Sequence, residues 1–289
     1  MKKIKNTLSV LLVMTIIIAL AACGGGSDSG TAATDAPEPA ATEASNASPA
    51  PSDEIDDAEE TDSAGDTEEG DVLVMGTNAE FPPYEFYEGD EIVGIDAEIA
   101  EAIAEKLGKE LVIEDMKFDA VLMAMQTGKI DMALAGMTVT EDRLENMDFS
   151  NSYATGIQSI IVPEGSDIKS PDDLTDKKIG VQSATTGDIY ATDDYGDEFV
   201  ERYNKGADAI LALKKGAIDC VVIDNEPAKV FAEENPELQI LDTEYLIEEY
   251  AVAVEKGNTE LLEKINEALE ELTADGTLES IIDKYIKAD

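Results

Sequence analysis

Arg143 is the side chain in this sequence best placed to bind an anion, because of the residues that precede it. Residues 130–143 read IDMALAGMTVTEDR: an apolar run, then small residues and hydroxyls, then the start of a helix. In open α/β sheets, ligands bind beyond the carboxyl ends of strands, where loop amides and helix starts are exposed. Arg143, Thr138 and the backbone of Gly136 and Met137 are therefore candidate ligand-binding groups. The alternative is an ordinary strand-to-helix turn that carries a surface arginine.

Three further strand ends carry polar residues. A guanidinium, hydroxyls, amides and a carboxylate together complement a zwitterion, because arginine can hold a carboxylate bidentately and a carboxylate can accept from an ammonium group. Each position has an alternative role, since threonine and aspartate also cap helices. The residues are Asn78 after strand 72–75, Thr185 and Thr186 after strand 178–181, and Asp224 after strand 218–223.

Short β-rich runs alternate with helical periodicity from residue 71 to the end, which predicts an α/β fold. Two successive strand-helix-strand units in the first half predict a parallel sheet, and the second half repeats this architecture. Further strands are predicted at 111–113, 130–134, 156–162 and 250–254. Helices are predicted at 94–107, 118–125, 207–214, 261–272 and 278–285, with further helix starts near residues 140, 170, 188 and 225.

The amino end is typical of an exported protein. Residues 1–5 are cationic and residues 8–20 form an apolar run that is too short to span a bilayer. The following Leu-Ala-Ala-Cys sequence resembles the processing box of bacterial lipoproteins. Residues 1–22 are therefore predicted to be a lipoprotein signal peptide, and lipidated Cys23 to anchor the chain to the outer face of the cell membrane. The alternative is a plain signal peptide followed by an incidental cysteine.

Residues 23–70 are predicted to form a disordered acidic linker behind the lipidated cysteine. Residues 24–70 contain no Lys or Arg and almost no large apolar residue. Such a segment cannot bury enough surface to offset its ordering entropy. The alternative, a carboxylate-rich cation site, lacks calcium-loop spacing.

Composition excludes several classes of function. The formal net charge of −45 disfavours binding to nucleic acid, which needs clustered cations. The absence of histidine excludes histidine-based triads and imidazole metal sites. Cys220, the second of the two cysteines, lies in an apolar run and is predicted to be a buried apolar residue. We therefore expect no cofactor, no metal and no catalytic residue.

Five ordered motifs then carry a family resemblance that extends from residue 71 to the end. The chain resembles the polar amino-acid-binding class (family 3) of solute-binding proteins that serve bacterial ABC importers. The motifs are GTNAEFPPYEF at 76–86, GIDAEIAEAIAEKLG at 94–108, FDAVLMAMQTGKIDMALAGMTVTEDR at 118–143, VQSATTG at 181–187 and IDNEPA at 223–228.

The resemblance implies a two-lobe, periplasmic-binding-protein-like clamp in which each lobe is a mainly parallel sheet flanked by helices. Lobe 1 would comprise residues 71–154 plus 251–289, and lobe 2 residues 155–250. The hinge would be crossed near residues 153–155 and 250–251.

Roles for individual residues also follow from the resemblance. It implies that Arg143 holds the α-carboxylate of an amino acid, assisted by Thr138 and the amide of Thr186, and that Asp224 and the backbone around Gly136 hold the α-ammonium. It also implies a pocket for the ligand's side chain. The residues implied there are Asn78, Phe81, Phe118 and, from the other lobe, Gln182.

Two departures from the family pattern bear on the ligand. Asn78 stands where many members have aspartate, and residues 135–136 stand where some have two serines. Glu80, Glu85 and Asp119 are nearby acids that could favour a cationic ligand, although such residues are more often solvated or capping.

The resemblance thus implies a monomer that captures a free polar or basic L-amino acid and delivers it to an ABC permease complex. An exported dehydratase-like enzyme on the same scaffold is one alternative, but no acid is marked as catalytic by its spacing. A ligand-binding module for a separate sensor is another.

Overall fold

Parallel strands form the first half of the folded body. The computed structural model describes residues 72–243 and 245–287, so the predicted signal peptide, Cys23 and the acidic linker lie outside the described residues. Strand β1 (Val72–Thr77) pairs in parallel with β5 (Glu110–Asp115) and with β6 (Met132–Ala133). Helices α1 (Ile95–Leu107) and α2 (Phe118–Gln126) connect them. The predicted strand-helix-strand units are confirmed here.

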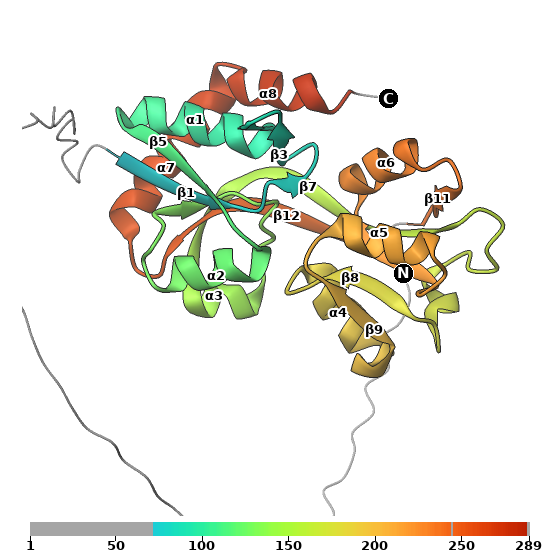
Figure 1. The fold of residues 1–289 in the computed structure, drawn as a ribbon. Coiled ribbons are helices and arrows are strands. Elements are labelled where there is room, and N and C mark those ends of the chain that lie inside the picture. The colour runs from blue at the N-terminus through green and yellow to red at the C-terminus, as the bar shows by residue number, and fades with distance from the viewer. Residues whose placement is uncertain (1–71, 244, 288–289) are drawn as a thin grey trace, which may run out of the picture. The chain divides into compact units, whose positions relative to one another are not determined.

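The second half repeats this arrangement with its own parallel strands. Strand β8 (Ile179–Gln182) pairs in parallel with β9 (Val200–Tyr203) and β10 (Cys220–Asp224). The helices of this half lie on both sides of these strands in Figure 1. They are α4 (Thr186–Tyr195), α5 (Gly206–Lys214) and α6 (Asn225–Glu234).

Two long strands join the halves. Strands β7 (Met147–Pro163) and β12 (Leu246–Glu255) pair antiparallel, and they run from one set of parallel strands to the other (Figure 1). The ladder is therefore continuous, in the order β5-β1-β6-β12-β7-β10-β8-β9. Its register shifts on both sides of Ala251. The halves are thus two lobes that share one sheet through its two longest antiparallel strands, β7 and β12.

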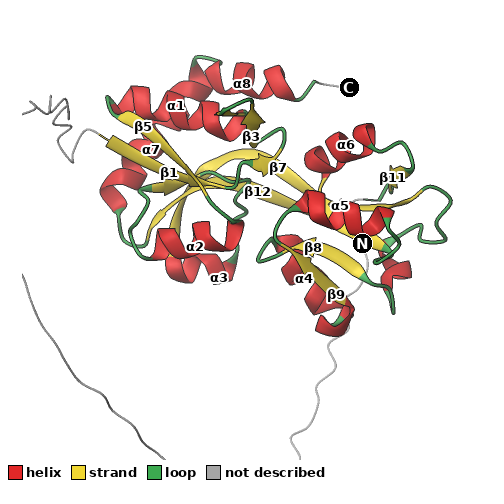
Figure 2. Ribbon diagram, viewed as in Figure 1, coloured by secondary structure: helices red, strands yellow, loops and turns green. Residues whose placement is uncertain are grey.

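Helices α7 (Thr259–Ala274) and α8 (Thr277–Tyr285) return to the first lobe and pack against α1 (Figure 2). Their apolar faces enter a buried cluster that also contains Leu73 and Ile99. The prediction that both faces are core packing is therefore confirmed. Among the described helices, none is both long enough and apolar enough to cross a lipid bilayer.

Several short elements escaped prediction. The cis Pro82–Pro83 bond lies in the turn that joins two strands of a small antiparallel sheet, and residues 238–240 pair with β7. These strands are only two to four residues long, too short for a period-2 pattern. They are β2 (Glu80–Phe81), β3 (Glu85–Glu88), β4 (Glu91–Val93), β9 and β11 (Leu238–Ile240).

Some predicted bounds also need correction. Strand 130–134 shortens to β6, because the side chain of Asp131 takes the place of a backbone acceptor: its Oδ2 accepts from the Val74 amide at 2.8 Å. The helix predicted from residue 170 is a single 3-10 turn, Pro171–Leu174. Strand 156–162 extends to all of β7, because residues 147–155 pair with β12 as well.

Candidate functional site

A buried cavity lies where the two lobes meet. Its free volume is about 20 Å³, which is room for about one water molecule and far below the roughly 300–1,000 Å³ typical of ligand pockets. Every candidate side chain except Met137 lines it; Met137 is fully buried in an apolar cluster instead. The lining residues are Asn78, Phe81, Glu85, Phe118, Ala135, Gly136, Thr138, Arg143, Gln182, Thr185, Thr186 and Asp224.

Arg143 supplies the positive charge of the cavity. It belongs to the short helix α3 (Glu141–Asn146), whose first turn is capped when Thr140 Oγ1 accepts from the Arg143 amide at 3.2 Å. Its guanidinium donates to the carbonyls of Thr138 at 2.7 Å and Ala184 at 3.3 Å, and it lies 5.3 Å from the ring centroid of Phe118. Burial lowers its pKa, but a guanidinium stays charged in proteins. A guanidinium has five N–H donors, so the donors that are not bonded to the two carbonyls remain available for a ligand.

Glu248 is a buried carboxylate near Arg143 that sequence reasoning missed. Its Oε2 accepts from Thr138 Oγ1 at 3.2 Å and from Gln158 Nε2 at 3.0 Å. Its charge also acts on Arg143. Thr138 therefore faces a carboxylate of β12 as well as the cavity. Glu248 and Glu249 are adjacent in β12, and nothing in the sequence indicates which of the two points inward.

Asp224 supplies a negative charge from the second lobe. It occupies the residue before helix α6, but its side chain makes no capping hydrogen bond there. Instead Asp224 Oδ1 accepts from the Tyr250 hydroxyl. Burial, with Glu248 nearby, raises the pKa of Asp224 to about 7. The capping alternative is thereby excluded for Asp224.

Gly136 and Glu85 lie at the same part of the cavity wall. Gly136 has a φ of 52°, and a Cβ there would lie 3.0 Å from the Phe81 ring, so the position favours glycine. This conformation directs its amide to Asp96 Oδ2 at 2.8 Å. Glu85 is buried against the cavity, whereas acids in such a motif are more often solvated.

Amide side chains close another part of the wall across the lobes. Gln182 Nε2 donates to Asn78 Oδ1 at 2.8 Å, and Asn78 Nδ2 donates to the Met116 carbonyl at 3.0 Å. At the rim, Lys205 of the second lobe pairs with Glu80 of the first. The described lobes are thus in direct contact around the cavity, and Asn78 is already hydrogen-bonded within the protein.

Thr185 and Thr186 begin helix α4. Thr185 Oγ1 accepts from the Asp188 amide at 3.3 Å and donates to the Gln182 carbonyl at 2.8 Å, so Thr185 caps the helix. Thr186 Oγ1 accepts from Gln158 Nε2 at 3.4 Å. Both threonines border the cavity, but the Thr185 hydroxyl is already occupied on both sides.

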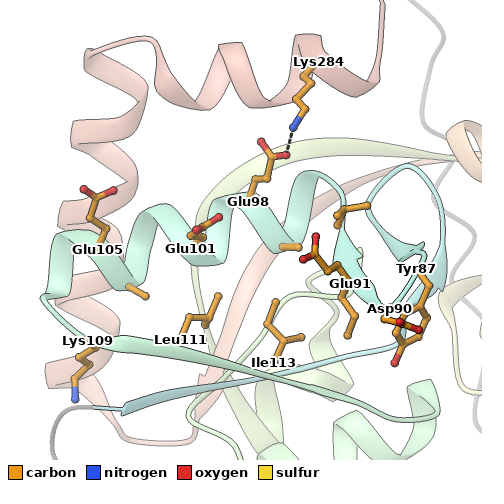
Figure 3. A pocket seen from close by; sticks show the side chains of 14 residues that line it. Tyr87, Asp90, Glu91, Glu98, Glu101, Glu105, Lys109, Leu111, Ile113 and Lys284 are labelled. Atoms are coloured by element: carbon orange, nitrogen blue, oxygen red, sulfur yellow. Dashed lines mark hydrogen bonds and ion pairs between the residues drawn. The ribbon is translucent and has the colours of Figure 1, made fainter.

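A wider hollow on the outside of the first lobe is a different kind of surface. It opens between α1, β4 and β5 and is lined by acids of α1, one of which, Glu98, pairs with Lys284 of α8 (Figure 3). Leu111 and Ile113 form part of its floor. It is open to solvent and none of the predicted ligand-binding residues lines it, so the buried cavity is the candidate site.

Two lobes joined by paired strands around a buried polar cavity define the class of solute-binding clamps. Residues 73–288 match the bacterial extracellular solute-binding proteins, family 3. The chain is 34% identical to the arginine-binding extracellular protein ArtP of Bacillus subtilis, covering 74% of this chain and 85% of ArtP. It is 30% identical to the L-cystine-binding protein TcyJ of Escherichia coli, covering 75% of this chain and 84% of TcyJ.

Solved structures agree with this match. The arginine-, lysine-, histidine-binding protein ArtJ of Geobacillus stearothermophilus superposes with a TM-score of 0.72 at 31% identity, over 75% of this chain and 96% of ArtJ. The chain therefore belongs to the bacterial extracellular solute-binding proteins of family 3. The resemblance inferred from the five motifs is confirmed, as is the two-lobe α/β fold.

Proposed function

We propose that this protein captures a free polar or basic L-amino acid between its lobes and delivers it to an ABC permease complex. The observation that carries the proposal is the presence of Arg143 and Asp224, of opposite charge, in the wall of one buried cavity. An α-amino acid carries the complementary pair of charges. In a water-poor cavity, charge-assisted hydrogen bonds to such a ligand are strong.

The roles of the lining residues follow from their chemistry. Arg143, with Thr138 and the amide of Thr186, would hold the α-carboxylate. Asp224 and the backbone at Gly136 would hold the α-ammonium. Phe81 and Phe118 would contact the ligand's side chain, near the cavity wall formed by Asn78, Gln182 and Thr185.

A basic ligand is favoured within this range. ArtP and ArtJ are named for binding arginine, and TcyJ for binding cystine. Besides Arg143, the charged residues lining the cavity are the acids Glu85 and Asp224. A cationic side chain suits a cavity wall that has more acidic than basic residues, and the aromatic rings of Phe81 and Phe118 offer faces on which a guanidinium can stack.

The remaining parts of the proposal concern the whole chain. Residues 71–154 plus 251–289 would move as lobe 1 and residues 155–250 as lobe 2, with the hinge in β7 and β12. Lobe closure would present a recognisable form to the permease. The protein would act as a monomer, tethered outside the cell membrane through lipidated Cys23, and would make or break no bond in its ligand.

A ligand screen followed by one substitution tests the proposal. A native-state ligand raises thermal stability, so the unfolding temperature is measured with each of the twenty common amino acids and L-cystine. Calorimetry with the best ligand then compares the wild type with Arg143→Ala. Truncating one partner of a buried charge pair costs about 2–5 kcal/mol, so binding should be lost or nearly lost.

Two variants serve as controls for that experiment. Arg143→Lys keeps the charge but lacks the planar fork, so it should bind more weakly than the wild type and better than Arg143→Ala. Arg202→Ala removes an arginine that pairs with Asp188 outside the cavity lining, and it should retain binding. Unchanged affinity in a folded Arg143→Ala variant would overturn the proposed role of Arg143.

A further inference from the structure

Two further buried acids, Glu85 and Asp96, lie beside the part of the cavity that contains Asp224. Glu85 of β3 is 1% exposed and Asp96 of α1 is fully buried. Glu85 lines the cavity, and Asp96 lies directly behind Gly136, whose amide donates to it. Neither acid has a cationic partner among the described ion pairs. Burying two acids without a counter-ion costs free energy of folding, which indicates that the two acids have a function.

The pair must hold a proton. Glu85 Oε2 and Asp96 Oδ1 are both buried, and no N–H or O–H of the described protein donates to either oxygen. The two acids are nevertheless close enough for the charge of Asp96 to raise the pKa of Glu85. Two neighbouring carboxyl groups buried in a low-dielectric site do not both ionise, so one of them carries a proton.

The surroundings assign that proton to Glu85. Asp96 Oδ2 accepts from the Gly136 amide at 2.8 Å and from the Tyr153 hydroxyl at 2.8 Å, and both donors stabilise an ionised Asp96. Burial and the neighbouring Asp96 raise the pKa of Glu85 well above its usual value, whereas the pKa of Asp96 rises to about 6. Glu85 is therefore the acid that carries the proton, and Asp96 is the ionised one.

Glu85 and Asp224 border one cavity from different lobes. They are close enough for the charge of Asp224 to raise the pKa of Glu85 further. Glu85 Oε2 has no hydrogen-bond partner among the described residues, so it can accept a hydrogen bond from a ligand. Other ionisable groups near the two acids are Arg143, which lines the same cavity, and Tyr84, Tyr153, Glu226, Glu248 and Tyr250.

We infer that Glu85 is a second acceptor for the ligand's ammonium group, and that ligand entry expels the proton carried by Glu85. This inference rests on the proposed function. An N–H of the ammonium donates to the Glu85 carboxylate, and the displaced proton passes to the buffer. Beside these two acids one cation replaces another, so the charge of this part of the cavity stays constant, which a low-dielectric site favours, while Arg143 balances the ligand's carboxylate.

Binding should then depend on pH in a defined direction. An ammonium group stabilises the ionised carboxylates, so affinity rises as pH rises through the titration range of the cluster. If one proton leaves per ligand, affinity changes by at most about tenfold per pH unit. Asp224 titrates in the same cavity, so a substitution at Glu85 is needed to separate the two contributions.

Glu85→Gln is a suitable variant, because its amide is neutral and similar in size to a protonated carboxyl group, while it has no proton to release. We expect the fold to be kept. Asp119→Asn is the matched control, because Asp119 is exposed and does not line the cavity.

Isothermal titration calorimetry in phosphate and in Tris at pH 7 measures the protons released on binding, because the two buffers differ in ionisation heat. The probe is L-arginine or, if L-arginine does not bind, the tightest binder among L-lysine, L-histidine, L-glutamine and L-cystine. The wild type and Asp119→Asn should release the same fraction of a proton, and Glu85→Gln should release less and bind about 10- to 100-fold more weakly.

The possible outcomes separate this inference from the proposed function. If no amino acid binds the wild type, the proposed function fails. If an amino acid binds and Glu85→Gln releases as many protons as the wild type, the inference fails while the proposed function stands. Infrared difference spectra of the wild type need no variant: a protonated-carboxyl band should be lost on binding, and its retention would also overturn the inference.

Discussion

Thr185 and Asp224 occupy equivalent places in two strand-to-helix connections of the second lobe. Each is the last residue before a helix, α4 or α6, and each borders the cavity. Thr185 caps its helix by accepting from the Asp188 amide, whereas Asp224 makes no capping bond and accepts from Tyr250 instead. Two residue types that commonly cap helices thus have different roles here: Thr185 caps its helix, and Asp224 does not.

The side chains of Thr185 and Asp224 behave differently because Tyr250 lies opposite Asp224 and donates to it. Tyr250 belongs to β12, and its ring packs closely over Gly156 of β7, where a Cβ would lie 2.4 Å from the ring carbon Cζ. Only glycine leaves room for that ring. The hydroxyl thereby reaches Asp224 and draws the carboxylate away from the helix start. Strands β7 and β12 therefore decide which connection keeps a carboxylate available for a ligand.

The largest effect should come from Asp224→Asn. The amide cannot balance the charge of a ligand ammonium, so affinity should fall by about 2–5 kcal/mol. Helix α6 should be unaffected, since Asp224 does not cap it. Calorimetry measures the affinity and far-ultraviolet circular dichroism the helix content. A loss of helix content with retained binding would reverse the contrast with Thr185.

The pH dependence of Asp224 should have opposite signs for stability and binding. Burial raises its pKa from 3.8 to about 7, so the folded free protein binds more protons than the unfolded chain between these values. The contribution of Asp224 to stability therefore falls as pH rises from about 4 to about 7, while ligand affinity rises because the ammonium needs the ionised form.

Urea unfolding of the wild type and Asp224→Asn, both without ligand, isolates the contribution of Asp224 to stability. The variant should gain stability relative to the wild type across this pH range, by about 1–3 kcal/mol. A difference that does not vary with pH would show that Asp224 is not protonated in the free protein.

Tyr250→Phe should have an intermediate effect. It removes the hydroxyl that donates to Asp224, so the pKa of Asp224 should rise further. At pH 7 fewer molecules would then carry the carboxylate, and affinity should fall by about tenfold, the size of one charge-assisted hydrogen bond. Raising the pH should restore part of the affinity. Tyr195→Phe, which removes a hydroxyl bonded to the Pro171 carbonyl, is the matched control and should bind normally.

The smallest effect on binding should come from Thr185→Ala. Loss of a helix cap costs about 1 kcal/mol of stability, whereas affinity should change by less than about threefold because the hydroxyl already has both partners inside the protein. Thr185→Ser keeps the cap and should restore stability. A large loss of affinity in a stable Thr185→Ala variant would show a direct bond to the ligand.

The strand-end positions of the site were predictable from local pattern. Asn78, Arg143, Thr186 and Asp224 each follow or lie near a run whose β-character is evident, and parallel strands bring their ends to one edge. The family resemblance added Phe81, Phe118 and Gln182. The role of Met137 was not predictable in this way, because its position in a binding loop does not specify which way its side chain packs.

The buried acids could not be predicted for a related reason. Glu85 follows two prolines and Tyr84 in a strand too short for a periodic pattern, and Glu248 has an identical neighbour at 249. Asp96 lies in the first turn of an amphipathic helix, where acids are common for electrostatic reasons. Their burial depends on contacts with residues from other parts of the chain.

Hydrophobic periodicity, turn residues and motif order were enough to establish the α/β class, most helices and strands, and the family. These features are local, and each is repeated over many residues. The continuous sheet through β7 and β12, the pairing of Tyr250 with Asp224, and the contact of Glu85 with Asp96 arise only after folding. They depend on long-range contacts in a buried, low-dielectric environment, where the position of one hydroxyl or proton changes the charge of the site.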